Sequence, residues 1–421
     1  MSIEKHPPAQ PQDSAPPPTP WQFVRLGDYR LPGPLGATAA LERWASLKRI
    51  FGRGSEPELP PVKAEADLRA LSQSRLQNLA RPIDWRCAVP ALNAVLAEWQ
   101  QAAPVGEAVR FVIGQPHCGH AQILAQWAAD HRAAVVEAPS VDRLLGDDGR
   151  WLDDWPAADR LWVLPNLEQC YLRHADGLGL VRSLLERAAS GALGRGVIGC
   201  DSWAWAYLRR VWPLPQPAAL TLQAFDGPRL SRYLAELVSC PGRDCLHFRN
   251  ATTGKELRLE PGSGDAEVSP EVNYLAVHSR GNIGVALHSW RSALRAVPEQ
   301  EQQVQPEAPA EVAGSLPAAV PDAEVDDIVW VSTALREPVL PAEGGEAMVF
   351  LLHGLLLHNG LPASLLPELL PQPRHRIASC LLELQALGVV VMAGERWQVS
   401  VAAYSVVREF LRRRGFLRDD F

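Results

Sequence analysis

The chain has 421 residues, more than one ordinary hydrophobic core organises, so two or three domains are expected. Hydrophobic residues make up 47% of it, a globular rather than a disordered composition. The 48 Asp plus Glu outnumber the 41 Lys plus Arg, and the formal net charge of −7 argues against a protein built mainly to coat nucleic acid.

Neither a metal centre nor a membrane span is expected. The seven cysteines are scattered and lack a metal-type repeat, and Cys240 and Cys245, which flank a short turn, have no second ligand pair to complete a zinc site. The most apolar stretch, 348–370, is interrupted by Gly, Pro, His and Asn, so it predicts core helices. The polar, Pro-rich start has no secretory signal, and we expect a cytoplasmic protein.

The first hundred residues divide into a tail and a helical region. Residues 1–20 are a Pro-rich segment that is expected to be disordered. Residues 21–101 are expected to be mostly helical, because apolar residues recur there at three- to four-residue spacing; the two runs are Leu41, Trp44, Leu47, Ile50 and Leu68, Leu71, Leu76, Leu79.

Residues 102–225 alternate between apolar strands and helices. The expected strands are 110–113, 133–137, 161–164, 197–200 and 220–222, and the expected helices are 121–129 and 178–188. This alternation predicts an α/β core with a parallel sheet covered on both faces.

Three further segments follow the core. Residues 226–297 are expected to form a smaller helical region with an inserted hairpin on either side of Thr253–Gly254. Residues 298–326 are rich in Pro, Glu, Gln and Ala and predict an acidic linker. Residues 327–421 predict three helices, two strands around Gly394 and a closing helix, the order of a winged helix.

A phosphate-loop spacing follows the first core strand. The spacing G-x-x-x-x-G-K-[ST] is matched by Gly114, Gln115, Pro116, His117, Cys118, Gly119, His120 and Ala121, which open a helix. Backbone N–H groups of such a loop cradle phosphate at a helix N-terminus. However, His120 takes the place of the lysine and Ala121 that of the hydroxyl that holds Mg²⁺. His117, Cys118 and His120 also form an H-C-x-H cluster, but a tight turn rarely lets neighbouring residues converge on one metal ion.

Residues 80–421 resemble AAA+ ATPases, and within them the bacterial origin-recognition-like group, in which a core and helical lid precede a winged helix. Several catalytic positions that the resemblance implies are altered. Pro165 and Asn166 follow the strand that should end in the acidic pair, and Glu168, the nearest carboxylate, is in a different register. Asp201 and Ser202 lie where such proteins place a polar γ-phosphate sensor. Gly284 stands where the lid arginine is expected.

The resemblance therefore implies a pseudo-ATPase. Phosphoryl transfer depends on charge neutralisation and positioning, which a pocket without the lysine, the hydroxyl, the acidic pair and the lid arginine does not supply. ATP or ADP is expected at most as a structurally bound nucleotide at residues 114–121, without a metal ion.

The last domain leaves two kinds of partner open. From Ala347 onward there are eight Arg and six Asp plus Glu, a net of +2. DNA contact would use Arg374, Arg376, Arg412 and Arg413. Apolar residues along the third helix, among them Ile377, Leu381 and Leu382, offer little to read bases and favour contact with a protein.

Three functions are consistent with the sequence. The first is a catalytically degenerate AAA+-like scaffold or regulatory protein that acts by binding partner proteins. The second is an ATP-binding switch with weak ATPase activity and a DNA-binding winged helix. The third is a DNA-binding regulator with an inert core.

Overall fold

The computed structural model describes residues 19–33, 62–63, 67–102, 108–146, 150–212, 218–238, 246–259, 268–298, 327–341, 345–416 and 419–421. The expected disordered tail up to residue 18, the helical run from Leu41 to Ile50, the pair Cys240 and Cys245, and nearly all of the expected linker 298–326 lie outside these residues.

A six-stranded sheet forms the core, in the order β1-β7-β3-β6-β5-β4. Its strands are β1 (Phe23–Arg25), β3 (Val109–Gly114), β4 (Ala134–Val135), β5 (Trp162–Leu164), β6 (Gly196–Asp201) and β7 (Ala219–Leu222). β3 to β7 pair in parallel and β1 joins β7 antiparallel, so the expected parallel sheet is confirmed. Because β3 lies between β6 and β7, the loop after β3 begins in the middle of the sheet, at the carboxyl ends of its parallel strands.

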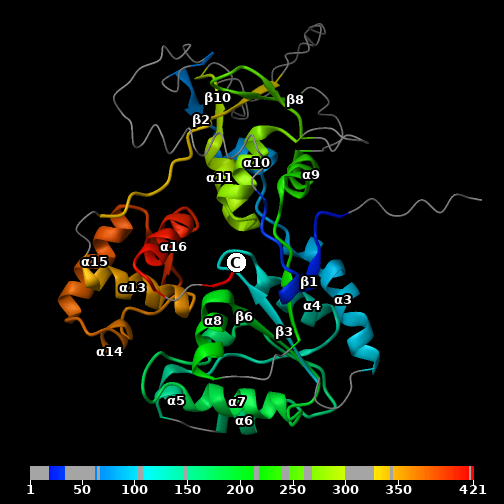
Figure 1. Ribbon diagram of the computed structural model, residues 1–421, viewed down its shortest axis with the longest axis vertical. Coiled ribbons are helices and arrows are strands. Elements are labelled where there is room, and N and C mark those ends of the chain that lie inside the picture. Colours follow the sequence, from blue (N-terminus) through cyan, green and yellow to red (C-terminus); the bar gives the residue numbers. More distant parts are fainter. Residues whose placement is uncertain are drawn as a thin grey trace, which may run out of the picture.

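Helices cover both faces of this sheet (Figure 1). Alternate residues of β3 separate the two layers: Val112 packs toward α3 (Val89–Ala102) and α4 (His120–Asp130), whereas Phe111 and Ile113 pack toward α7 (Gly179–Ala189) and α8 (Ser202–Val211). Two short helices, α5 (Val141–Leu145) and α6 (Arg150–Asp153), lie beside α7.

A second sheet of five strands has the order β2-β10-β11-β8-β9. Its strands are β2 (Arg69–Ala70), β8 (Leu246–Asn250), β9 (Glu256–Leu257), β10 (Leu294–Ala296) and β11 (Asp327–Val331). Four helices belong with this sheet: α2 (Gln73–Leu79), α9 (Gly227–Val238), α10 (Pro270–His278) and α11 (Ile283–Ala293). We call the second sheet and these four helices the lid region. β8 and β9 form the expected hairpin.

Two segments differ from the expected organisation. The region 21–101 contains strands as well as helices, because β1 extends the core sheet and β2 pairs with β10. These strands have two or three residues, too few to show an alternating pattern. β11, at the expected start of the last domain, instead pairs in parallel with β8 of the lid region.

The C-terminal part, residues 345–421, contains the expected succession of elements. They are α13 (Glu346–Leu357), α14 (Leu366–Leu369), α15 (Arg374–Ala386), β12 (Val390–Ala393), β13 (Arg396–Val399) and α16 (Tyr404–Arg413). Its buried residues, such as Leu352 and Leu411, belong to the same apolar core as the α7 and α8 face of the main sheet. The C-terminal part is therefore packed against the core.

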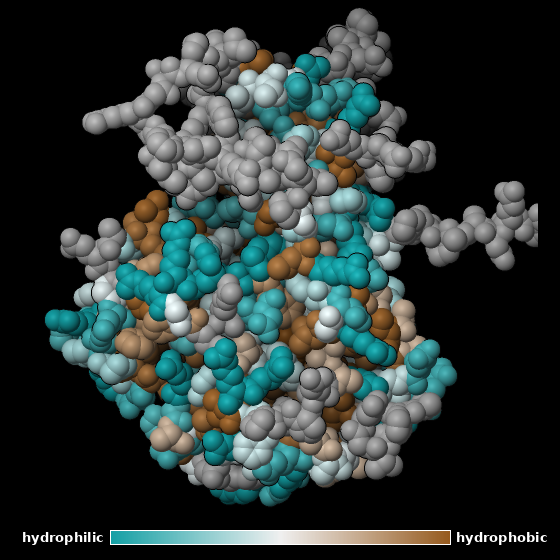
Figure 2. All heavy atoms as spheres, in the orientation of Figure 1, coloured by the Kyte–Doolittle hydropathy of each residue, from teal (hydrophilic) through white to brown (hydrophobic). Residues whose placement is uncertain are grey.

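The surface in Figure 2 mixes polar and apolar side chains over the described elements. None of the helices in the described part of the chain has the length and apolar content needed to cross a membrane.

Candidate functional site

The loop between β3 and α4 has a backbone that depends on glycine. Gly119 has a φ of 75° and His117 a φ of 68°, both in the left-handed region. A Cβ on Gly119 would lie 2.3 Å from the ring of Trp85, so no side chain fits there. The left-handed backbone and the contact with Trp85 both require glycine at position 119.

The side chain at the lysine position turns back into the loop. A Cβ on Gly114 would lie 2.6 Å from both His120 Nδ1 and Cys118 Sγ, so these two side chains lie over the first glycine. His120 is 5% exposed, and burial lowers its pKa to about 4. The imidazole is therefore neutral at pH 7 and, with Ala121 next to it, supplies neither a cation nor a hydroxyl.

The first turn of α11 lies directly on the loop. The Asn282 side-chain amide donates to the Pro116 carbonyl at 2.8 Å, and its Oδ1 accepts from the backbone N–H of Gly284 and Val285 at 3.1 and 3.2 Å. A Cβ on Gly284 would lie 2.0 Å from the carbonyl oxygen of His117. The position expected to carry the lid arginine thus has no room for any side chain.

Two buried carboxyl groups lie beside the loop. Asp201 ends β6 opposite Gly114 of β3, and Glu168 lies in η4 (Leu167–Gln169), after β5. The backbone N–H of Asp201 donates to Glu168 Oε2 at 3.0 Å, and that of Trp203 donates to Asp201 Oδ1 at 2.9 Å. In the sequence Glu168 lies beyond the position expected for the acidic pair after β5. The short helix η4 nevertheless brings its side chain to the end of β6, where it accepts from the backbone N–H of Asp201.

Burial makes this pair retain a proton. It raises the pKa of Glu168 to about 7 and that of Asp201 well above its usual range, and the Glu168 charge raises the pKa of Asp201 further. Arg396 and Asn359 oppose the shift at Glu168. In the described part of the chain, no group of three or more His, Cys, Asp or Glu side chains is arranged to hold a metal ion.

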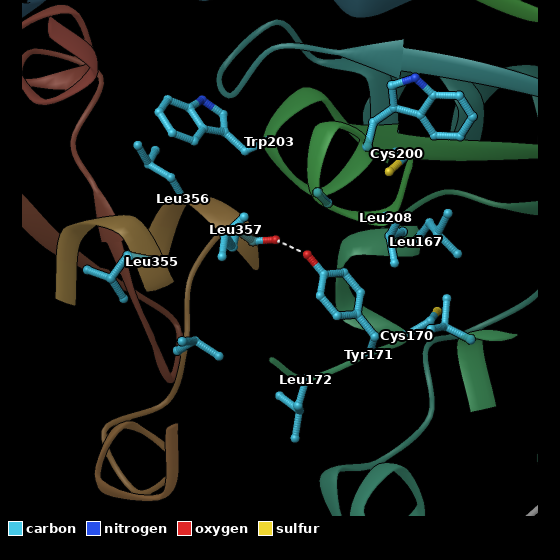
Figure 3. Close-up of a cluster of buried hydrophobic side chains, with 14 of the residues drawn as sticks. Leu167, Cys170, Tyr171, Leu172, Cys200, Trp203, Leu208, Leu355, Leu356 and Leu357 are labelled. Carbon is cyan, nitrogen blue, oxygen red and sulfur yellow. Dashed lines mark hydrogen bonds between the residues drawn. The ribbon is translucent and has the colours of Figure 1, made fainter. Parts of the chain in front are cut away.

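The C-terminal part docks onto the segment around Glu168. The Tyr171 hydroxyl donates to the Leu357 carbonyl at 2.8 Å, within an apolar cluster drawn in Figure 3. His358 Nε2 accepts from the backbone N–H of Arg173 at 3.4 Å, which places its proton on Nδ1, facing the Glu168 carbonyl at 3.4 Å. Burial lowers the pKa of His358 to about 3, so the ring is neutral.

Further contacts continue this interface along the sheet edge toward the loop. Arg396 donates to Gln169 Oε1 at 3.2 Å, and Trp203 Nε1 donates to the Tyr404 hydroxyl at 3.3 Å. The rings of Tyr404 and His117 have centroids 5.8 Å apart. The C-terminal part therefore contacts the carboxyl ends of β5 and β6 and the loop after β3.

The four arginines considered for DNA contact are exposed, and three of them pair with a glutamate. Arg374 and Arg376 are exposed at the start of α15, and Arg374 lies 3.5 Å from Glu368. Arg412 and Arg413 both donate to Glu409, at 2.6 and 2.8 Å. Of the apolar residues expected along α15, Ile377 and Leu381 are buried, whereas Leu382 is 63% exposed.

No sequence motif assigned three charged residues to the neighbourhood of the loop. Arg280, Arg408 and Asp419 meet there, and Arg408 and Asp419 are almost fully buried. The sequence does hold one signal for Arg408: it follows Val407 on the apolar face of the closing helix, where a charge requires a buried partner.

Comparison with known proteins gives little further guidance. No family model and no curated protein matches the chain. Among solved structures it is similar to Cdc6p from Pyrobaculum aerophilum, with 10% sequence identity and a TM-score of 0.27 over 88% of this chain and 99% of that chain. A match at this TM-score does not by itself establish a common fold.

Proposed function

We propose that the chain is a catalytically degenerate AAA+-like scaffold or regulatory protein that acts by binding partner proteins. The proposal draws on the loop between the central strand β3 and α4, the lid region that packs on it, and the C-terminal succession of three helices and two strands. These features support an AAA+-like core and a winged-helix domain, and the protein would work in the cytoplasm.

The observation that carries the proposal is the state of His120. A neutral, buried imidazole at the lysine position cannot neutralise β- and γ-phosphate charge, and Ala121 cannot hold Mg²⁺. The carboxyl pair Glu168 and Asp201, whose pKa values burial raises so that the pair retains a proton, is likewise poorly suited to bind a cation. We therefore assign no catalytic residue, and ATP or ADP would serve only as a structural ligand.

Nucleotide turnover and binding test this proposal. Purified protein should release no phosphate from ATP above the background rate, with or without Mg²⁺. Calorimetric titration with ATP and ADP decides whether the loop still holds a nucleotide. Turnover that disappears in Gly119→Glu would overturn the proposal and favour the ATP-dependent switch with a DNA-binding winged helix.

The partner surface is proposed to lie on α15 and β12. Four apolar side chains are exposed there: Leu382, Leu387, Val391 and Met392. The exposed Arg374 and Arg376 lie at the start of the same helix. Apolar groups in the middle of an interface and arginines at its edge are typical of protein contacts. We therefore favour a protein partner over DNA at this surface.

A further inference from the structure

Residues Asp419–Phe421, which we call the C-terminal segment, contact both the core and the C-terminal part; Asp419 and Phe421 are buried and Asp420 is exposed. Asp419 and Phe421 are 2% and 3% exposed. Asp419 Oδ2 accepts from the Ser202 hydroxyl at 2.5 Å, and its Oδ1 accepts from Arg408 Nη2 and Nε at 3.0 and 3.2 Å. Ser202 directly follows Asp201, so the segment reaches the carboxyl end of β6.

The same segment joins the lid region to the loop. The main-chain oxygen of Phe421 accepts from Arg280 Nε and Nη2 at 3.1 and 2.7 Å, and also from Arg408. Its ring lies against Tyr29, with centroids 4.7 Å apart. The Tyr29 hydroxyl accepts in turn from Gln115 of the loop at 3.1 Å. Figure 1 shows the end of the chain beside the turn that follows β3.

Two guanidinium groups converge at this point. Burial lowers the pKa of Arg280, and the nearby charge of Arg408 lowers it further, as expected for two like charges close together. Among the described residues, the oxygen atoms that accept hydrogen bonds from both groups belong to the C-terminal segment. Arg280 also has a φ of 54°, an unusual conformation for a residue with a side chain.

Two converging guanidinium groups, of which Arg408 is buried and Arg280 half-buried, need oxygen acceptors and are suited to a phosphate or carboxylate. We propose that Arg280 and Arg408 form a binding site for a phosphate-type anion beside the loop, and that the C-terminal segment is its internal occupant. Displacement of the segment opens the site to an external anion. The inference requires neither ATP binding nor ATP hydrolysis at residues 114–121.

Calorimetric titration with pyrophosphate tests the proposal. Asp419→Asn keeps the shape of the side chain but removes the charge that competes for Arg408. This variant, and a chain that ends at Arg418, should bind pyrophosphate about tenfold or more tighter than the starting protein, equivalent to about 1.4 kcal/mol of competition removed. Adding Arg280→Met to Asp419→Asn should abolish the gain.

Glu409→Gln is the matched control, because it changes the net charge by the same amount, and Glu409 pairs with the exposed Arg412 and Arg413 rather than with Arg280 or Arg408 in the described part of the chain. Pyrophosphate binding that is equally tight in Glu409→Gln and Asp419→Asn would mean a general charge effect and overturn the site. So would a folded Asp419→Asn protein that binds no tighter than the starting chain. If the shortened chain does not fold, Asp419→Asn alone decides.

Discussion

A methyl group on Gly284 would meet the His117 carbonyl oxygen at 2.0 Å, closer than any Cβ contact in a relaxed structure. The absence of a side chain at this position is therefore a packing requirement of the lid region on the loop. The same holds for Gly119 against Trp85. Gly284 replaces the expected lid arginine and Gly119 matches the phosphate-loop spacing, and at both positions the missing side chain allows two elements to touch.

We expect Gly284→Ala to destabilise the protein by about 1–3 kcal/mol, because α11 or the loop must move to admit the methyl group. Urea denaturation followed by circular dichroism measures the change. Gly33→Ala is the control, since a Cβ there meets nothing within 4 Å. An equal, small effect of both substitutions would show that α11 is not seated on the loop.

The buried carboxyl pair predicts a particular pH dependence. The pKa of Glu168 is about 7 in the folded chain, above the ordinary value of 4.5, so folding favours its protonated form. The stabilisation of the fold by protonated Glu168 is fully present below pH 4.5 and is lost as the pH rises through 7. When the pH rises from 4.5 to 7, the free energy of unfolding of the Glu168→Gln variant should fall by roughly 1–3 kcal/mol less than that of the starting protein. Parallel stability–pH curves for the two proteins would contradict this assignment.

At the scale of elements, the interface between the C-terminal part and the core combines a shared apolar cluster with buried hydrogen bonds. Tyr171 is fully buried and its hydroxyl satisfies the Leu357 carbonyl at the end of α13. Tyr207 stacks on Tyr171 with an interplanar angle of 15° but is only partly buried. The two tyrosines are stacked neighbours, but Tyr171 is the more deeply buried and its hydroxyl donates to a buried carbonyl.

Tyr171→Phe should therefore cost about 1–2 kcal/mol, because it leaves a buried carbonyl without its donor, whereas Tyr207→Phe should cost much less. Thermal unfolding of the two variants checks the difference. Hydrogen exchange should also show faster exchange at the end of α13 in Tyr171→Phe. Equal losses in the two variants would mean that the interface does not depend on this bond.

The sequence predicted the longer core elements well, for physical reasons. β3, β6, α4 and α7 have enough residues for alternating or helical apolar patterns to be readable. β1 and β2 have three and two residues, so their pairing depends on partners far away in the chain. The same limit applies to the site: residues 114–121 are local in sequence, whereas the contact of Glu168 with Asp201 and that of Arg408 with Asp419 follow from tertiary packing.

For the whole molecule, the net charge of −7 and the pairing of Arg412 and Arg413 with Glu409 work against DNA. We expect duplex DNA to bind more weakly than about 10 µM at physiological salt, within the non-specific range. Fluorescence anisotropy over a series of salt concentrations checks this. Tight, strongly salt-dependent binding that is lost in Arg374→Ala with Arg376→Ala would favour a DNA-binding regulator.

The position of β11 bears on how this protein could be divided. β11 lies between β10 and β8 in the second sheet, although residues 297–326 separate it in sequence from β10. A recombinant fragment that ends at residue 298 would lack a middle strand and leave two open sheet edges, an arrangement prone to aggregation. Two co-expressed polypeptides, split inside 299–326, should instead reassemble and purify as one complex. The apparent boundary in the sequence is thus a poor place to truncate the gene and a good place to split it.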